Sequence, residues 1–258
     1  VINTHSVETL QKRKLDIRIM HRFGDLFGDS GGWETFYGLE NATDVAIGAE
    51  YGVTDNFTVG LLRAKGAGPL RQLVNGLAKY RILRQAESEG SPISLTAVGV
   101  LSVSTMQKSE NPEAINFFQT FEHRMAYTVQ ALIARQFSER FSLQIAPGYT
   151  HRNLVQFGDQ NGIVSLGLAS RIQVTKVIGL ILDANLPLSG EQSVLEENEA
   201  YAPALGIGLE FDTGGHVFQI NLTNATGIME NDYIPYTTSQ WSEGEFRLGF
   251  TISRLFNL

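Results

Sequence analysis

Apolar and polar residues alternate along most of the chain, and a period of two residues places successive side chains on opposite faces of a strand. The alternation predicts strands over residues 14–23, 43–51, 57–64, 73–84, 93–105, 125–137, 141–151, 162–171, 176–187, 201–211, 217–225 and 245–256. It does not reach residues 1–12, which we interpret as a periplasmic N-terminal segment ahead of one barrel domain, residues 13–258.

The connections between the strands are alternately short and long. The short ones are residues 52–56, 86–92, 138–140, 172–175 and 212–216, and the long ones are residues 24–42, 65–72, 106–124, 152–161, 188–200 and 226–244. Short periplasmic turns opposite long extracellular loops, together with an even strand count, are typical of transmembrane barrels. The pattern predicts an all-β chain that forms a single antiparallel up-and-down β-barrel of about 12 strands in the outer membrane of a Gram-negative bacterium.

One face of the predicted strands is almost free of charge, as in Ile17 and Ile19 or Val45 and Ile47. A soluble lipocalin-like barrel or a sandwich would bury such a face, so alternation does not decide which face is outside. Aromatic residues of this face gather at both strand ends, as an aromatic girdle at each membrane interface does. They are Tyr51, Phe57, Phe137, Phe141, Phe211, Phe218 and Phe256 beside the turns, and Phe23, Tyr127, Tyr149, Tyr201 and Phe246 near the loops. The apolar face is therefore assigned to lipid.

The opposite face carries equal numbers of acids and bases, which we predict to form a charge network in the lumen. They are Asp16, Asp44, Glu50, Asp183 and Glu210 with Arg18, Lys79, Arg81, Arg171 and Arg247. An ion-selective pore biases its wall to one charge sign, whereas balanced charges can pair across a narrow lumen. A narrow or filled interior with a mostly structural network is favoured, and a small-solute channel is the alternative.

Composition excludes several other classes of protein. The 27 acidic and 20 basic residues give a net charge of -7, which does not suit a nucleic-acid partner. The sequence has no cysteine and therefore no disulfide or thiolate metal site. No apolar run approaches the roughly 18 residues of a membrane-spanning helix.

The candidate catalytic and metal-binding residues are few. None of the five histidines has HExxH spacing, and we predict no catalytic residue, no metal and no cofactor. The stretch GYTHRNL around His151 is similar to the start of the outer-membrane phospholipase A motif, but Asn153 stands where that motif has its serine nucleophile. Two loop stretches could supply oxygen ligands for calcium, although solvated loops are the commoner explanation. One holds Glu196, Glu197 and Glu199, and the other holds Asp159 with Asn161.

Several phrases resemble a β-barrel family of unknown function from Bacteroidota outer membranes. They are VINTHSVET, DIRIMHRFGDLFG, YGLENATDVAIGAEYGVTDNFTVGLLRA, LAKYRILRQ and APGYTHRNLV, spread over nearly the whole chain. The chain departs from the family at residues 67–72, where AGPLRQ replaces a longer polar loop. The resemblance implies an outer-membrane barrel and no particular activity.

Taken together, these features lead us to expect a noncatalytic barrel that serves as a structural or accessory subunit of an envelope assembly. Its partners would be outer-membrane lipid and other envelope proteins, which its long loops would contact. A narrow small-solute channel is the alternative, and an outer-membrane lipid hydrolase a less favoured one.

Overall fold

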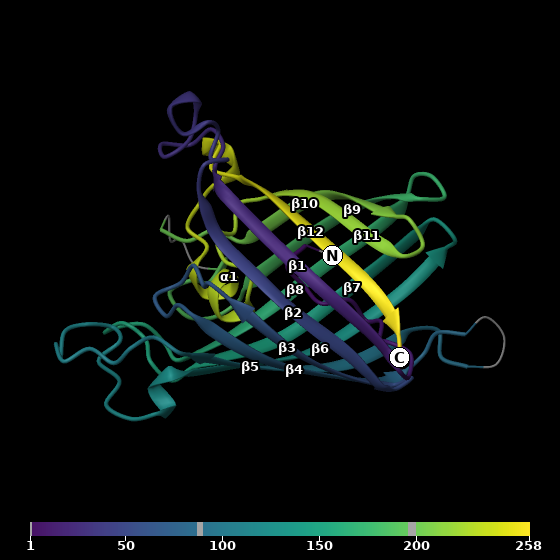
Figure 1. Cartoon of the computed structure of the whole chain (residues 1–258), viewed down its shortest axis with the longest axis horizontal. Helices are drawn as coiled ribbons and strands as arrows, with labels where there is room; N and C mark the ends of the chain where they lie inside the picture. The colour runs from purple at the N-terminus through teal and green to yellow at the C-terminus, as the bar shows by residue number, and fades with distance from the viewer. Residues whose placement is uncertain (1, 87–89, 196–199) are drawn as a thin grey trace.

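The computed structural model describes residues 2–86, 90–195 and 200–258. Its strands form one closed antiparallel barrel in which every strand pairs with its neighbours in sequence and β1 pairs with β12 (Figure 1). The strands are β1 (Lys14–Asp25), β2 (Ala42–Thr54), β3 (Phe57–Ala64), β4 (Leu73–Leu83), β5 (Ser94–Ser104), β6 (Met125–Ser138), β7 (Phe141–Arg152), β8 (Gly162–Gln173), β9 (Ile178–Pro187), β10 (Ala204–Asp212), β11 (His216–Thr223) and β12 (Arg247–Asn257). The predicted fold class and strand number are confirmed.

Closure depends on the pairing of the first and last strands. Leu15 lies opposite Phe256, and Arg22 lies opposite Gly249, with a register shift before Asp25 pairs with Arg247. Because every strand has two neighbours, the barrel exposes no strand edge, and all ladder hydrogen bonds are made inside the sheet.

The two ends of the barrel differ. In Figure 1 the long loops and a short helix, α1 (Glu230–Tyr236), lie at one end, and the short turns and the C-terminus lie at the other. Three single-turn 3-10 helices, η1 (Trp33–Thr35), η2 (Glu122–Arg124) and η3 (Trp241–Glu243), belong to the loop end. In the described part of the chain, no helix has the length and apolarity needed to cross a membrane.

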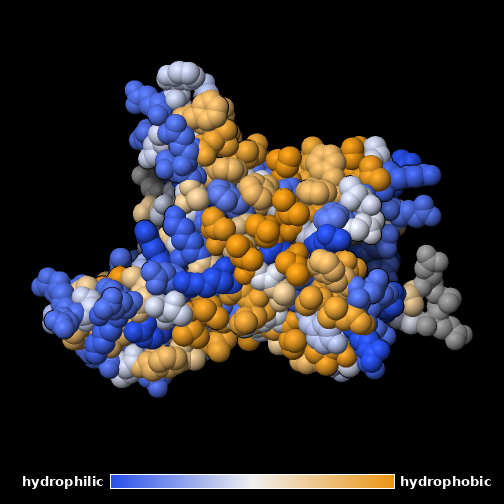
Figure 2. Space-filling model, viewed as in Figure 1, coloured by the Kyte–Doolittle hydropathy of each residue, from blue (hydrophilic) through white to orange (hydrophobic). Residues whose placement is uncertain are grey.

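The outer wall between the two ends is apolar. Figure 2 shows hydrophobic side chains over the middle of the barrel and hydrophilic ones at both ends. Ile47, Leu61 and Val129 are each more than half exposed on this wall. Such exposure is favourable only where lipid replaces water, because a soluble protein buries a continuous apolar surface of this size.

Candidate functional site

The lumen is occupied by two segments of the chain itself. Residues 2–12 run along the inner wall from the turn end, and residues 224–239 of the β11–β12 loop fold inward from the loop end. The sequence predicted residues 1–12 as a periplasmic segment and residues 226–244 as an extracellular loop. The described parts of both segments make most of their contacts inside the barrel.

The N-terminal segment is held by hydrogen bonds to wall side chains that reach its backbone. The Val7 N–H donates to Gln144 Oε1 at 2.8 Å, and Gln144 Nε2 donates to the His5 carbonyl at 2.7 Å. The Thr96 hydroxyl donates to the Val7 carbonyl at 2.6 Å. A single glutamine thus binds the segment on both sides of Ser6, as a neighbouring strand would.

Three members of the predicted charge network also hold this segment. Asp183 accepts the N–H groups of Ile2 and Thr4 at 3.3 and 3.2 Å. Lys79 Nζ donates to the Glu8 carbonyl at 2.7 Å. Arg81 lies 3.6 Å from the exposed Glu8 carboxylate. The charges therefore bind an inserted chain instead of pairing across an empty lumen.

The β11–β12 loop is bound to other residues of the wall and to the loop that follows β3. Asp44 is fully buried and accepts the Ile228 N–H at 2.8 Å. Asp232 in α1 accepts the Ala67 N–H at 3.1 Å, and Ser102 donates to Asn231 at 2.9 Å. Arg247 donates to the carbonyl of Asn224 at 2.8 Å, at the start of the loop.

Both segments also pack on an apolar sector of the inner wall. The loop contributes Ile228 and Met229 and the N-terminal segment contributes Val7, all at most 9% exposed. The wall contributes Ala46, Leu62, Ala64, Leu73, Leu77, Val98, Val100, Leu132 and Ala146. Full burial of one large apolar side chain contributes about 1.5–3 kcal/mol, so this cluster is a main source of the docking free energy.

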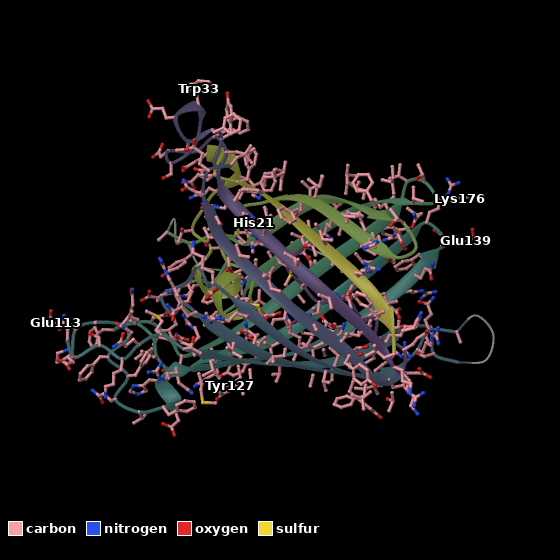
Figure 3. The ribbon with its side chains drawn as sticks, in the orientation of Figure 1. His21, Trp33, Glu113, Tyr127, Glu139 and Lys176 are labelled. Atoms are coloured by element: carbon pink, nitrogen blue, oxygen red, sulfur yellow. The ribbon has the colours of Figure 1, made fainter. Side chains whose placement is uncertain are left out.

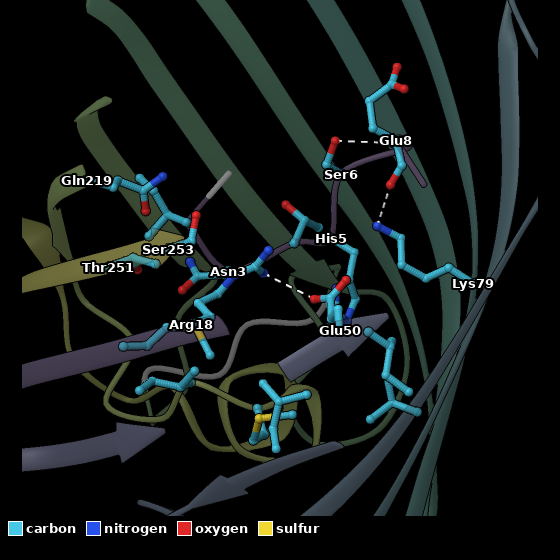
Figure 4. Close-up of a pocket in the computed structure, with 18 of the residues that line it drawn as sticks. Asn3, His5, Ser6, Glu8, Arg18, Glu50, Lys79, Gln219, Thr251 and Ser253 are labelled. Carbon is cyan, nitrogen blue, oxygen red and sulfur yellow. Dashed lines mark hydrogen bonds and ion pairs between the residues drawn. The ribbon is translucent and has the colours of Figure 1, made fainter. Parts of the chain in front are cut away.

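The two segments meet in the lumen. His5 Nε2 lies 2.7 Å from Glu230 Oε1, which forms an ion pair when the imidazole is protonated. Arg22 links the segments a second time, because its guanidinium donates to Asn3 Oδ1 at 2.9 Å and to the Gly227 carbonyl. Figure 4 shows the N-terminal residues Asn3, His5 and Glu8 beside the wall residues of this region.

The remaining predicted network residues pair with each other. Arg18 lies 2.8 Å from Asp16 and 3.3 Å from Glu50, and Arg171 lies 2.9 Å from Glu210. The ten predicted residues thus divide between ion pairs on the wall and contacts to the inserted segments. Sequence analysis missed Arg22, although it continues the parity of Asp16 and Arg18 along β1.

The inserted segments leave two cavities. One of about 310 Å³ lies between them, lined by Arg18, Glu50, Lys79 and other residues of both segments and the wall. The other, about 540 Å³, lies between the N-terminal segment and the wall near the turns, with Arg171 and Glu210 among its lining residues. Each is within the range of small-molecule pockets, about 300–1,000 Å³. Outside the apolar sector the wall carries polar side chains, and among these both side-chain polar atoms of Gln130 and of Asn185 lack a hydrogen-bond partner among the described residues.

Burial changes the protonation of the loop that enters the lumen. Asp232 lies in α1, outside the strands, and is almost fully buried. Desolvation, together with the nearby Asp44 carboxylate, raises the pKa of Asp232 to about 8. At neutral pH this carboxyl group is therefore mostly neutral while the loop is docked.

Aromatic residues form contacts at both ends of the outer wall. Beside the turns, the rings of Phe137 and Phe141 lie 5.7 Å apart. At the loop end, the ring of Tyr127 stacks on His151 at 5.0 Å, and Figure 3 labels Tyr127 there. Tyr201 differs from the predicted girdle position, because it lines a cavity among the loops with Phe157 and Tyr236.

The candidate residues for catalysis and calcium have structural contacts. His151 lies in the aromatic cluster with Tyr127 and is 3.3 Å from the Tyr149 hydroxyl, while Asn153 donates to the Glu122 carbonyl. Asp159 pairs with Arg152 at 2.9 Å. Of the other proposed calcium ligands, Glu196, Glu197 and Glu199 lie outside the described residues. Within residues 2–86, 90–195 and 200–258, no group of three His, Asp or Glu side chains could hold a metal ion.

Comparisons with known proteins place this geometry among membrane barrels. A family profile described as membrane bound beta barrel domain (DUF5777) matches residues 1–256. A search of curated proteins finds no match.

Solved structures of similar fold include porins and a channel. A KdgM porin in complex with disordered oligogalacturonate has a TM-score of 0.56 at 8% identity, over 94% of this chain and 99% of that chain. The NanC porin has a TM-score of 0.54 at 9% identity, over 95% and 100%. An outer-membrane channel from Pseudomonas putida F1 has a TM-score of 0.56 at 13% identity, over 99% and 100%. At these identities the likeness concerns the fold alone.

Proposed function

Because the chain belongs to the DUF5777 family of membrane-bound β-barrels, we propose that it is an outer-membrane channel for small polar solutes, closed by its own N-terminal segment and β11–β12 loop. The observation that carries this proposal is the meeting of the two segments at His5 and Glu230, inside a polar-walled lumen. This replaces a purely structural subunit as the preferred interpretation. The predicted Bacteroidota source stays a prediction.

A polar lumen is costly for a barrel with only a structural role. Buried polar groups without partners destabilise a protein, and an apolar packed core is often the more stable alternative. Gln130 and Asn185 present such groups to the lumen. Their hydrogen-bonding capacity is useful where water or a solute passes. The named porins and the channel of similar fold support the same interpretation.

The contacts that close the lumen suit a reversible closure. Besides the apolar cluster around Val7, Ile228 and Met229, both segments are held by hydrogen bonds and ion pairs. The His5–Glu230 pair joins the two segments without involving the wall. Water can replace these polar contacts one by one when a segment withdraws. The ten predicted wall charges balance and Arg22 adds a single base, so we expect little selection by charge sign and solutes that are small, polar and neutral or zwitterionic.

Planar-bilayer recording tests the proposal with the full barrel. We expect low conductance from the wild type, and a clear increase after deletion of residues 1–10, which removes most of the inserted N-terminal segment. The double variant H5A/E230A tests the closure without deleting chain and should open more often than the wild type. E113Q, on a loop that Figure 3 shows far from the barrel mouth, is the matched charge-removal control.

The result that would overturn the proposal is the absence of conductance in all these proteins. A change of gel mobility on heating, which folded barrels show, must first confirm that each variant is folded. Equal conductance in the deletion variant and the wild type would show that the N-terminal segment does not close the lumen.

A further inference from the structure

The first loop, residues 26–41 between β1 and β2, projects sideways from the barrel. Figure 1 shows it beyond the barrel wall at the loop end, and Figure 3 labels Trp33 at its tip. Glu113 lies on a different loop, which extends along the barrel axis (Figure 3). If the barrel spans a bilayer, the first loop therefore runs over the membrane surface and not away from it.

This loop exposes an unusual amount of apolar surface. Phe27, Trp33, Phe36, Tyr37 and Leu39 are 59, 77, 53, 41 and 39% exposed, respectively. Figure 2 shows hydrophilic side chains on the side of the projection away from the barrel and apolar ones on the side toward the apolar belt. A cluster of exposed aromatic residues with one polar side is typical of a surface that contacts a membrane or another protein.

The backbone fixes the shape of the loop. Phe36 and Tyr37 have positive φ angles of 47° and 55°, a conformation that non-glycine residues rarely adopt. The Tyr37 N–H donates to the Gly32 carbonyl at 2.7 Å, and the Gly24 N–H donates to the Gly38 carbonyl at 2.9 Å. The exposed rings therefore lie on an ordered turn that is held by backbone hydrogen bonds.

The rings of the loop continue into the outer wall of the barrel. Phe27 contacts Tyr37 at 5.7 Å on one side and Phe246 at 5.8 Å on the other. Phe246 in turn stacks on Trp241 at 4.7 Å. Trp241 lines a groove of the outer wall together with Leu182, Leu205 and Ile207. The aromatic surface is thus continuous from the lipid-facing strands to the loop.

From this continuity we infer that the loop of residues 26–41 is a lateral membrane anchor whose rings enter the headgroup region of the outer leaflet. Aromatic rings favour this depth, where one edge is apolar and the other is hydrated. The loop has no Lys or Arg, so its attraction rests on apolar area and not on anionic headgroups. Its acidic residues, Asp29, Glu34 and Glu40, suit the water side. This anchor lies outside the lumen and goes beyond the proposed channel.

Fluorescence tests the anchor directly, because Trp33 and Trp241 are the only tryptophans in the sequence. The variant W241F, folded into phosphatidylcholine vesicles, leaves Trp33 as the sole reporter. We expect brominated phosphatidylcholine to quench its emission strongly, and aqueous acrylamide to quench it weakly. The matched reporter is the variant W33F/W241F/F157W, because Phe157 is fully exposed among the loops at the barrel mouth. Acrylamide should quench the tryptophan at position 157 strongly, and brominated phosphatidylcholine should quench it weakly.

Two results would overturn the inference. If acrylamide quenches Trp33 as fully as the reporter at position 157, and bromolipid does not, the loop projects into water and its rings are available to a protein partner. If bromolipid quenches both reporters equally, the loop is not a distinct anchor. Strong quenching by bromolipid at Trp33 alone, in vesicles without anionic lipid, supports the inference.

Discussion

Substituting Asp44 by alanine should release the β11–β12 loop from the lumen. Asp44 is fully buried, and its carboxylate accepts the N–H groups of Ile228 at 2.8 Å and of Gly66 at 2.9 Å. A hydrogen bond to a charged group contributes about 1.5–3 kcal/mol. Because about 1.4 kcal/mol changes an equilibrium constant tenfold, loss of the Ile228 bond should raise the undocked fraction of the loop roughly 10- to 100-fold.

Hydrogen exchange measured by mass spectrometry gives this fraction for a folded barrel in detergent. Exchange from a locally opening segment follows the population of its open state. In D44A, peptides from residues 225–237 should exchange faster by the same factor, and peptides from the 65–72 loop should also respond because Gly66 loses its acceptor. Peptides from β7 and β8 should not change.

The matched control for D44A is E210A. It also removes a wall carboxylate, but Glu210 is bonded to Arg171 and not to the β11–β12 loop. Unchanged exchange of residues 225–237 in D44A would refute the reasoning, since the Asp44 contact would then contribute nothing to docking. A similar acceleration in E210A would also refute it, because the effect would then be a general one of lost wall charge.

Three further predictions concern other contacts. The pKa of Asp232 is raised to about 8 in the docked loop and is about 4 when solvated, so docking is strongest below about pH 4 and weakens as pH rises toward 8. Hydrogen exchange of residues 225–237, corrected for the intrinsic rate, should therefore rise over this pH range in the wild type and stay flat in D232N. R22A should accelerate hydrogen exchange in both residues 2–10 and residues 225–237, and R22K should not restore protection, because a lysine cannot make the forked contacts of Arg22. Faster exchange in one segment alone would contradict the role of Arg22 in linking the two segments. L61K should lower the free energy of unfolding in vesicles by about 2–4 kcal/mol, because Leu61 is on the lipid-facing wall. Urea titration measures this change, and a value near zero would contradict the assignment of Leu61 to lipid.

The strands could be predicted because one face of each strand meets lipid and the other meets the lumen. The alternation therefore persists for the full length of a strand, and β3 begins and ends at the predicted residues. The largest differences are three residues, at the end of β2, predicted at residue 51 and found at Thr54, and at the start of β10, predicted at residue 201 and found at Ala204. The difference at β10 has a structural cause. There the Ala202 N–H donates to the Thr237 carbonyl at 2.9 Å, so this stretch pairs with the inserted loop and not with a neighbouring strand.

The contents of the lumen could not be predicted in the same way. The sequences of residues 2–12 and 224–239 show no apolar–polar period, because these residues are fixed by individual hydrogen bonds to the wall and not by a sheet. The Asp44 contact, for example, joins residues 184 positions apart in the chain. Parity placed Asp44 on the inner wall, but nothing in the sequence indicates that a backbone N–H group would be its partner.

The balance of charge on the wall has a second explanation once the inserted segments are known. Asp44 and Asp183 bind backbone N–H groups, and Lys79 binds a backbone carbonyl, so the inserted segments supply uncharged hydrogen-bond partners to three of the wall charges. Docking through these contacts leaves the net charge of the wall unchanged, and withdrawal of the segments would expose the ten balanced charges together with Arg22. For the proposed channel, this nearly balanced wall would give little selection by the sign of a solute's charge. Selection would then come from the width of the cleared lumen and from hydrogen bonds to groups such as Asn185, which suits polar solutes better than ions.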